Sequence, residues 1–108
     1  MADLAPVPDR SERWTFLTNH AHALICITRD PDIRIRELAH AIGVTERTAQ
    51  AVVNDLVDGG YVERRRVGNR SHYKVHPDLP FRHRVERHHD VRDLLVVLTA
   101  DTHEEQSR

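Results

Sequence analysis

This chain lacks the cysteines for an internal disulfide and any long apolar segment. Its 108 residues include one cysteine, Cys26, which cannot form an internal disulfide, so a disulfide framework is excluded and a reducing compartment is favoured. The thiol lies near the apolar side of an expected helix, and we interpret it as buried and unreactive. No apolar run approaches the length of a membrane span or a signal sequence. We therefore expect a cytoplasmic protein with no membrane partner.

Aromatic residues are also scarce, at 5%, and only four glycines are present, so each glycine is a useful marker of a turn. A chain of this length has room for one domain with one core. Lys74 is the only lysine among 16 cationic residues. This arginine-rich composition is typical of GC-rich bacterial genomes, so we expect a bacterial source.

Catalytic signatures are missing as well. No serine or cysteine stands with a histidine in a recognisable setting, and no glycine-rich phosphate loop is present. We predict a non-enzyme that needs no cofactor. Nine histidines invite a metal hypothesis, but no pair stands four residues apart on a helix beside a carboxylate, so no metal site is predicted. Most are interpreted as surface histidines, while a site shared between subunits stays open for His83, His88, His89 or His103.

The most informative stretch runs from Ile35 to Gly60 and predicts two helices joined by a sharp turn. Apolar residues recur at helical spacing in both halves, first at positions 38, 39 and 42 and then at 49, 52, 53 and 56. Gly43 stands where the first helix must reverse, a position that favours a positive φ. Val44 is expected to plug the turn from below, and Thr45 to cap the second helix.

An earlier helix is expected before this motif, after a flexible lead-in over residues 1–10. Either its apolar stripe begins at Trp14 and Leu17, or Thr18 caps a helix that starts at Asn19. Both alternatives end near Arg29, because the pair Asp30-Pro31 is a stop signal.

A hairpin is expected after the motif. Two β-prone runs, residues 61–67 and 71–75, flank Gly68-Asn69-Arg70, a turn sequence that suits a positive φ. The short segment from Asp32 to Arg34 is expected to pair with them as a third strand. A small three-stranded antiparallel sheet is the predicted result.

Two interpretations fit the chain after Pro80. One long helix could begin at Phe81, or a shorter helix could follow a cap at Asp90, and we favour the shorter one. Its apolar stripe is too hydrophobic for an exposed terminal segment and must pack on the first helix, on a second copy, or on both. We expect dimerisation, with the following candidate residues: Trp14, Leu17, Val91, Leu94, Leu95 and Leu98.

Charge is unevenly distributed although the net charge is only −1. Residues 61–76 carry five cationic side chains against Glu63, whereas residues 93–108 carry four acidic side chains against Arg108. Binding to a polyanion is therefore expected to be focused on the middle of the chain.

The order of elements and the motif sequences resemble a winged helix-turn-helix transcriptional regulator of the ArsR/MarR-like group. The resemblance covers about residues 14–76 and rests on ELAHAIGVTERTAQAVVNDL followed by GGYVERRRVGNRSHYKV. It implies an α+β, mainly α fold, with the DNA-binding domain over residues 11–80, a C-terminal helical segment over 81–100 and an acidic tail over 101–108. Arg34 and Arg36 stand where metal-sensing members of the group have cysteines, so a thiolate sensor is not expected.

The resemblance implies recognition of double-stranded DNA by a homodimer, with a reading helix over Thr45–Asp58 in the major groove. Arg47 would read guanine, Gln50 or Asn54 adenine, and Ala51 a thymine methyl group. Thr45 and Thr48, at the helix start, would meet phosphate.

The hairpin over Tyr61–Val75 is expected to enter a minor groove. Its candidate contacts are Arg65, Arg66, Asn69 and Arg70, because arginine is favoured by the negative potential there. The faces of Arg64 and Lys74 depend on strand register. An alternative is a winged-helix module that binds a protein and no DNA. Any small-molecule effector stays unidentified.

Overall fold

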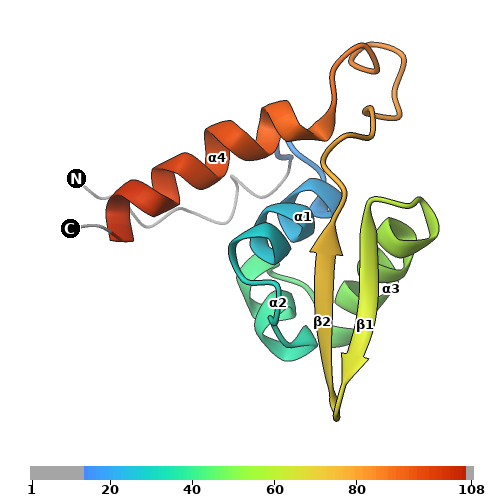
Figure 1. Ribbon diagram of the computed structural model, residues 1–108, viewed down its shortest axis with the longest axis vertical. Coiled ribbons are helices and arrows are strands. Elements are labelled where there is room, and N and C mark those ends of the chain that lie inside the picture. Colours follow the sequence, from blue (N-terminus) through green and yellow to red (C-terminus); the bar gives the residue numbers. More distant parts are fainter. Residues whose placement is uncertain (1–13, 107–108) are drawn as a thin grey trace.

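The computed structural model describes residues 14–106, with side chains described through residue 100. The lead-in expected over residues 1–10 lies outside this part. Three helices form a compact group beside a hairpin, and a fourth helix runs across one end (Figure 1). The fold is a winged helix, mainly α, as predicted. In chain order the elements are α1 (Asn19–Arg29), α2 (Ile35–Ile42), α3 (Glu46–Asp58), β1 (Val62–Val67), β2 (Arg70–Val75) and α4 (Val91–Gln106).

Helix α1 begins at Asn19, which decides between the two sequence alternatives. The Thr18 side-chain oxygen accepts a hydrogen bond from the backbone N–H of Ala21 at 3.2 Å and caps the helix. Trp14 and Leu17 precede the helix and do not continue its stripe. The helix ends at Arg29, before the predicted Asp30-Pro31 stop.

The helix–turn–helix forms as the sequence predicts. Gly43 has φ +78° and its N–H donates to the Ala39 carbonyl at 2.9 Å, which closes the end of α2. Thr45 caps α3, since its side-chain oxygen accepts from the Thr48 N–H at 3.1 Å. Ala39 and Ala49 are buried, and α2 packs against α3.

The core lies between α1, α2, α3 and the inner face of the hairpin, and the start of α4 extends it. Every buried side chain among the described residues is apolar or aromatic. Ile27, Leu38 and Val53 are the largest of those that are completely enclosed. The apolar periodicity that predicted the helices is therefore the periodicity of the core.

The sheet has two strands, so the prediction of a third strand over Asp32–Arg34 is wrong. The reason is that all three backbone N–H groups of this segment are engaged locally. Those of Asp32 and Ile33 donate to the Asp30 side chain and carbonyl, at 3.1 and 3.0 Å, and that of Arg34 donates to the Glu37 carboxylate at 3.0 Å. One backbone–backbone hydrogen bond, from the Tyr73 N–H to the carbonyl of Pro31 just before the segment at 2.8 Å, links this connection to β2.

The hairpin closes through a two-residue turn at Gly68-Asn69, and β1 pairs with β2 from Val62↔Val75 to Val67↔Arg70. Gly68 has φ +65°, which suits the first position of a type II′ turn. Among the described residues, only glycines have a positive φ.

Helix α4 begins at Val91, as the favoured shorter interpretation predicts. Residues 81–90 form a loop, pinned at its base by a backbone bond from Phe81 to His89 at 3.1 Å. The helix continues to Gln106, beyond the end expected at residue 100. None of the described helices is long and apolar enough to cross a membrane.

Candidate nucleic-acid interface

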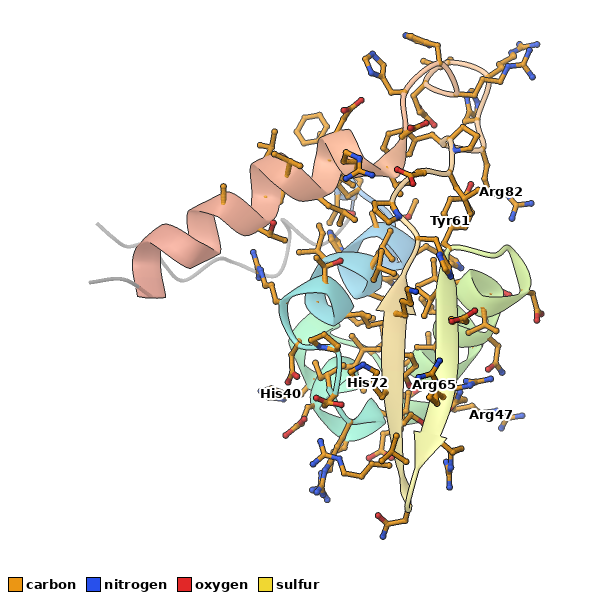
Figure 2. The ribbon with its side chains drawn as sticks, in the orientation of Figure 1. His40, Arg47, Tyr61, Arg65, His72 and Arg82 are labelled. Carbon is orange, nitrogen blue, oxygen red and sulfur yellow. The ribbon has the colours of Figure 1, made fainter. Side chains whose placement is uncertain are left out.

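Helix α3 divides into a buried and an exposed face. Ala49, Val52, Val53 and Leu56 are buried, and the opposite face points away from the core. Of the residues predicted to contact DNA from this helix, Arg47, Thr48, Ala51 and Asn54 are exposed and Gln50 is half-buried. Arg47 projects outward from the body of the molecule (Figure 2). The helix therefore presents one guanidinium and two amides to solvent.

A groove of about 560 Å³ lies between α3, the start of α2 and the hairpin. Its wall carries four arginines and one carboxylate, Asp32, so it is positively charged. The two amides of α3 open into the same groove. The residues that line it are Asp32, Ile33, Arg34, Ile35, Gln50, Asn54, Arg64, Arg66, Asn69, Arg70, Ser71 and Tyr73.

Strand register separates the arginines of β1. Side chains alternate between the two faces of the hairpin, so Arg64 and Arg66 lie on the face of the buried Val62, toward α3. Arg65 lies on the opposite face, directly across from His72. The sequence prediction grouped Arg65 with Arg66 and set Arg64 aside, whereas the structure brings Arg64 and Arg66 together.

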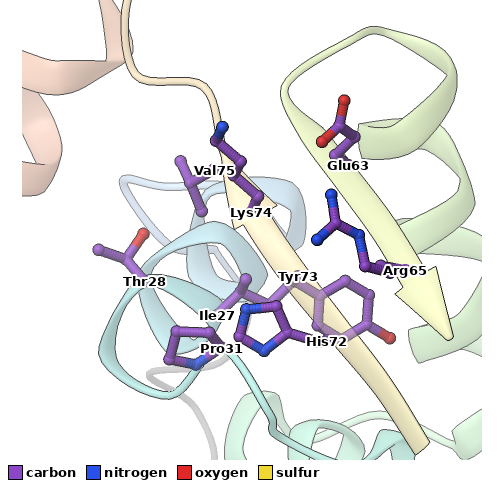
Figure 3. A pocket seen from close by; sticks show the side chains of 9 residues that line it. All are labelled: Ile27, Thr28, Pro31, Glu63, Arg65, His72, Tyr73, Lys74 and Val75. Atoms are coloured by element: carbon purple, nitrogen blue, oxygen red, sulfur yellow. The ribbon is translucent and has the colours of Figure 1, made fainter. Parts of the chain in front are cut away.

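The opposite face of the hairpin has its own shallow pocket of about 370 Å³, against the end of α1 and Pro31 (Figure 3). Arg65, His72 and Lys74 line it together with Glu63 and several apolar groups. Arg65 therefore belongs to a different surface from the arginines that face α3.

One side-chain hydrogen bond joins α3 to the hairpin, and a second, within α3, shares its acceptor. The Asn54 carbonyl oxygen Oδ1 accepts from Gln50 Nε2 and from Arg64 Nη1, each at 3.1 Å. Arg64 comes from β1, so a side chain of the hairpin is tied to the exposed face of α3. Sequence reasoning missed this role because the direction of Arg64 depends on register.

A second pair of contacts ties the hairpin to the connection between α1 and α2. Arg70 Nη2 donates to the Asp32 carbonyl at 2.6 Å, and His72 Nδ1 lies 2.7 Å from Asp32 Oδ1. All three side chains are partly or largely exposed. Arg34, from the same connection, also lines the groove and was not predicted to do so, because its segment was expected to be a strand.

The start of α3 is the last part of the candidate interface. Thr45 Oγ1 donates to Thr48 Oγ1 at 3.1 Å while accepting from the Thr48 N–H, so both hydroxyls take part in the cap. Both residues are exposed. The positive end of the helix dipole adds to the attraction for an anion at this place.

A sequence model of the MarR family matches residues 15–70, from just before α1 to the first residue of β2. The match covers more than half of the chain. The chain belongs to the MarR family. Members of this family are DNA-binding transcription regulators and not enzymes, so the predicted resemblance is confirmed and narrowed to MarR. A search of curated proteins finds no match.

The matched segment of this MarR-family regulator contains all of α3 and every residue that lines the groove except Ser71 and Tyr73. No histidine of the described residues lines the groove, and several histidines pair singly with carboxylates, such as His20 with Asp55 and His89 with Asp93, each at 2.8 Å. Among the side chains that the structure describes, no three histidines, cysteines or carboxylates converge on a metal-sized site.

The cysteine of the regulator is half-buried in α1. Burial raises the pKa of the Cys26 thiol above its ordinary value, and the positive charge of Arg29 offsets part of that rise. A raised pKa means less thiolate at neutral pH, which agrees with the interpretation of an unreactive thiol.

The residues predicted for dimerisation take different places. Val91 and Leu95 are each 5% exposed and belong to the core of their own chain, and Leu17, Leu94 and Leu98 are half-buried. Trp14 is 66% exposed, and its ring meets that of Phe16 edge-on at 5.1 Å. Large apolar side chains also point outward from α4 itself, namely Val96 and Val97.

Proposed function

We propose that this regulator is a homodimer that binds a specific DNA sequence, with α3 in the major groove and the hairpin in the adjacent minor groove. The observation that carries the proposal is the groove between α3 and the hairpin, where two amides and four arginines converge. Amides discriminate base edges, whereas guanidinium groups bind phosphate and the narrow minor groove. One surface therefore offers both recognition and affinity.

On α3, the exposed side chains match the donor and acceptor pattern of the major groove. Arg47 donates to guanine O6 and N7, an amide pairs with adenine N6 and N7, and the methyl group of Ala51 meets that of thymine. Thr45 and Thr48 bring the N-terminal backbone N–H groups of α3 to a phosphate. This assignment is supported by the exposure of these residues on one helix face.

On the hairpin, Asn69 and Arg66 lead into the minor groove, and Arg70 follows beside them. Arg34 and Arg64, which line the protein groove between α3 and the hairpin, neutralise the flanking phosphates. Arg65 contributes only its charge, because it lies on the opposite face. Val67, next to the hairpin turn, is 60% exposed and offers an apolar contact to the minor groove.

The outer face of α4 is the proposed dimer contact. Val96 and Val97 are 60% and 62% exposed on one helix, which costs free energy unless a second copy covers them. The other proposed contacts are Trp14, Leu17 and the partly exposed Leu94 and Leu98. A symmetric dimer would place two reading helices about 34 Å apart, in successive major grooves. Because its ligand is chromosomal DNA, we place the regulator in the cytoplasm.

The test is selection of bound duplexes from a random pool, followed by sequencing and by light scattering of the free protein. We expect one enriched inverted repeat whose half-sites lie about 10 base pairs apart, and a dimeric mass. A variant with Val96 and Val97 both changed to Asp should be monomeric and enrich single half-sites weakly. A pool that stays random would support the alternative of a protein-binding module.

A further inference from the structure

Asn54 occupies the centre of the contact between α3 and the hairpin, although its position on the exposed face is that of a base-reading residue. We propose that Asn54 is a positioning residue that orients Gln50 for adenine and ties the hairpin to α3, and that Gln50 is the amide that reads the base. This inference rests on the proposed function and assigns the two amides that the sequence leaves equivalent.

The orientation of the Asn54 amide follows from the chemistry of its partner. A guanidinium group can only donate hydrogen bonds, so the Asn54 atom that faces Arg64 must be the carbonyl oxygen. The same oxygen contacts Gln50, whose facing atom must then be the Nε2 donor. One arginine therefore sets the orientation of both amides.

The hydrogen-bonding capacity of Asn54 is then largely used. A carbonyl oxygen has two lone pairs, and both are occupied at 3.1 Å. A bidentate pair with adenine requires a free carbonyl to accept from N6 and an amide N–H to donate to N7. Asn54 lacks that free acceptor, so it is a poor partner for adenine in this arrangement.

Gln50 retains the free carbonyl oxygen that Asn54 lacks. Among the described residues its Oε1 has no hydrogen-bond partner, and its Nε2 retains a second N–H. Its side chain is half-buried and lies one helical turn before Asn54, so the bond between them restricts the Gln50 rotamer. Restricting the amide before binding lowers the entropic cost of reading the base.

The hydrogen bonds of Asn54 also connect the two parts of the interface, α3 and the hairpin. Arg64 belongs to β1, and its bond to Asn54 fixes the hairpin relative to the exposed face of α3. A change at Asn54 is therefore expected to affect both base selectivity and the contacts of the hairpin.

The experiment compares base-preference profiles of the full chain, obtained by selection from the random pool, for wild type, Gln50→Ala, Asn54→Ala, Asn54→Asp, Arg64→Ala and the double variant Gln50→Ala/Asn54→Ala. Asn54 and Arg64 are exposed and Gln50 is only half-buried, so these variants should fold, and thermal unfolding checks this. Gln50→Ala should abolish preference at one base pair in each half-site, a loss of about 5- to 150-fold.

Asn54→Ala should weaken preference at that same base pair, by less than Gln50→Ala, and the double variant should match Gln50→Ala at that position. Arg64→Ala should soften the same position and reduce binding to all duplexes. Asn54→Asp is the matched control, because its carboxylate still accepts from both donors. It should retain the wild-type profile while binding every duplex more weakly through charge repulsion.

Three results would overturn the inference: loss of preference at a different base pair in Asn54→Ala, an unchanged profile in Asn54→Ala, or an Asn54→Asp profile that matches Asn54→Ala. The first would make Asn54 a base-reading residue in its own right. A wild-type protein without preference at any position would instead refute the proposed function.

Discussion

Replacing Gly43 by alanine tests the turn that holds the reading helix. Gly43 has φ +78° and ψ +36°, and a Cβ placed there would meet no atom within 4 Å, so the cost is conformational and not steric. A left-handed conformation costs an L-residue about 1–2 kcal/mol, and the stiffer unfolded chain returns about 0.4–1 kcal/mol. Gly43→Ala should therefore destabilise the protein by about 1 kcal/mol.

Urea unfolding measures this difference directly, as a lower midpoint with an unchanged slope. In a thermal scan the same change lowers Tm by about 4–8 °C. Gly43→Asn is the control, since asparagine tolerates the left-handed region better and should lose less. If alanine were as stable as glycine, or if asparagine cost as much as alanine, the conformational explanation would be wrong.

Further predictions concern the core, the interface and the thiol. Leu38→Ala should cost about 2–5 kcal/mol in urea unfolding, because Leu38 is 0% exposed, while the exposed Arg36→Ala should be nearly neutral. Arg47→Ala should lose about 1–3 kcal/mol of preference at one guanine and little affinity for scrambled DNA. Arg66→Ala should weaken binding to every duplex and reduce the slope of log K against log salt by about 0.9, and an unchanged slope would remove Arg66 from the phosphate contacts. Cys26 should react with iodoacetamide at pH 8 more slowly in the native protein than in urea, because it is half-buried and its pKa is raised, and equal rates would contradict its burial.

Local signals in the sequence were sufficient to predict most elements of the fold. The cap at Thr45, the left-handed Gly43 and the apolar spacing on α3 all act within a few residues, and each is present in the structure. The glycine at position 68 likewise fixed the place of the hairpin turn. Such features are predictable because neighbouring residues determine them.

Features that depend on the choice of hydrogen-bond partner, on strand register or on packing between elements were not predictable in the same way. Asp32–Arg34 has the composition of a short strand, but its N–H groups donate to the Asp30 side chain and carbonyl and to the Glu37 carboxylate. The separation of Arg65 from Arg64 depends on register, and a shift of one residue would reverse it. The spacing of apolar residues places Val91 and Leu95 on one stripe of the helix. Only the packing of α4 on α1 shows that their own chain buries them.

The dual use of the α3 face also lies beyond sequence reasoning. Gln50 and Asn54 have the same chemistry and neighbouring positions, so nothing in the sequence separates their roles. The separation comes from Arg64, ten residues after Asn54, whose donor groups orient both amides. A contact between two elements thus determines which side chain is free to read DNA.

The central claim is that one groove supplies both base recognition and phosphate affinity. Its most direct test is a fluorescence anisotropy titration of the selected duplex and of a scrambled duplex with equal composition, each at two salt concentrations. The selected duplex should bind at least about 10³-fold more tightly, and both affinities should fall as salt rises. Equal affinities for the two duplexes, or affinities that do not change with salt, would contradict the claim.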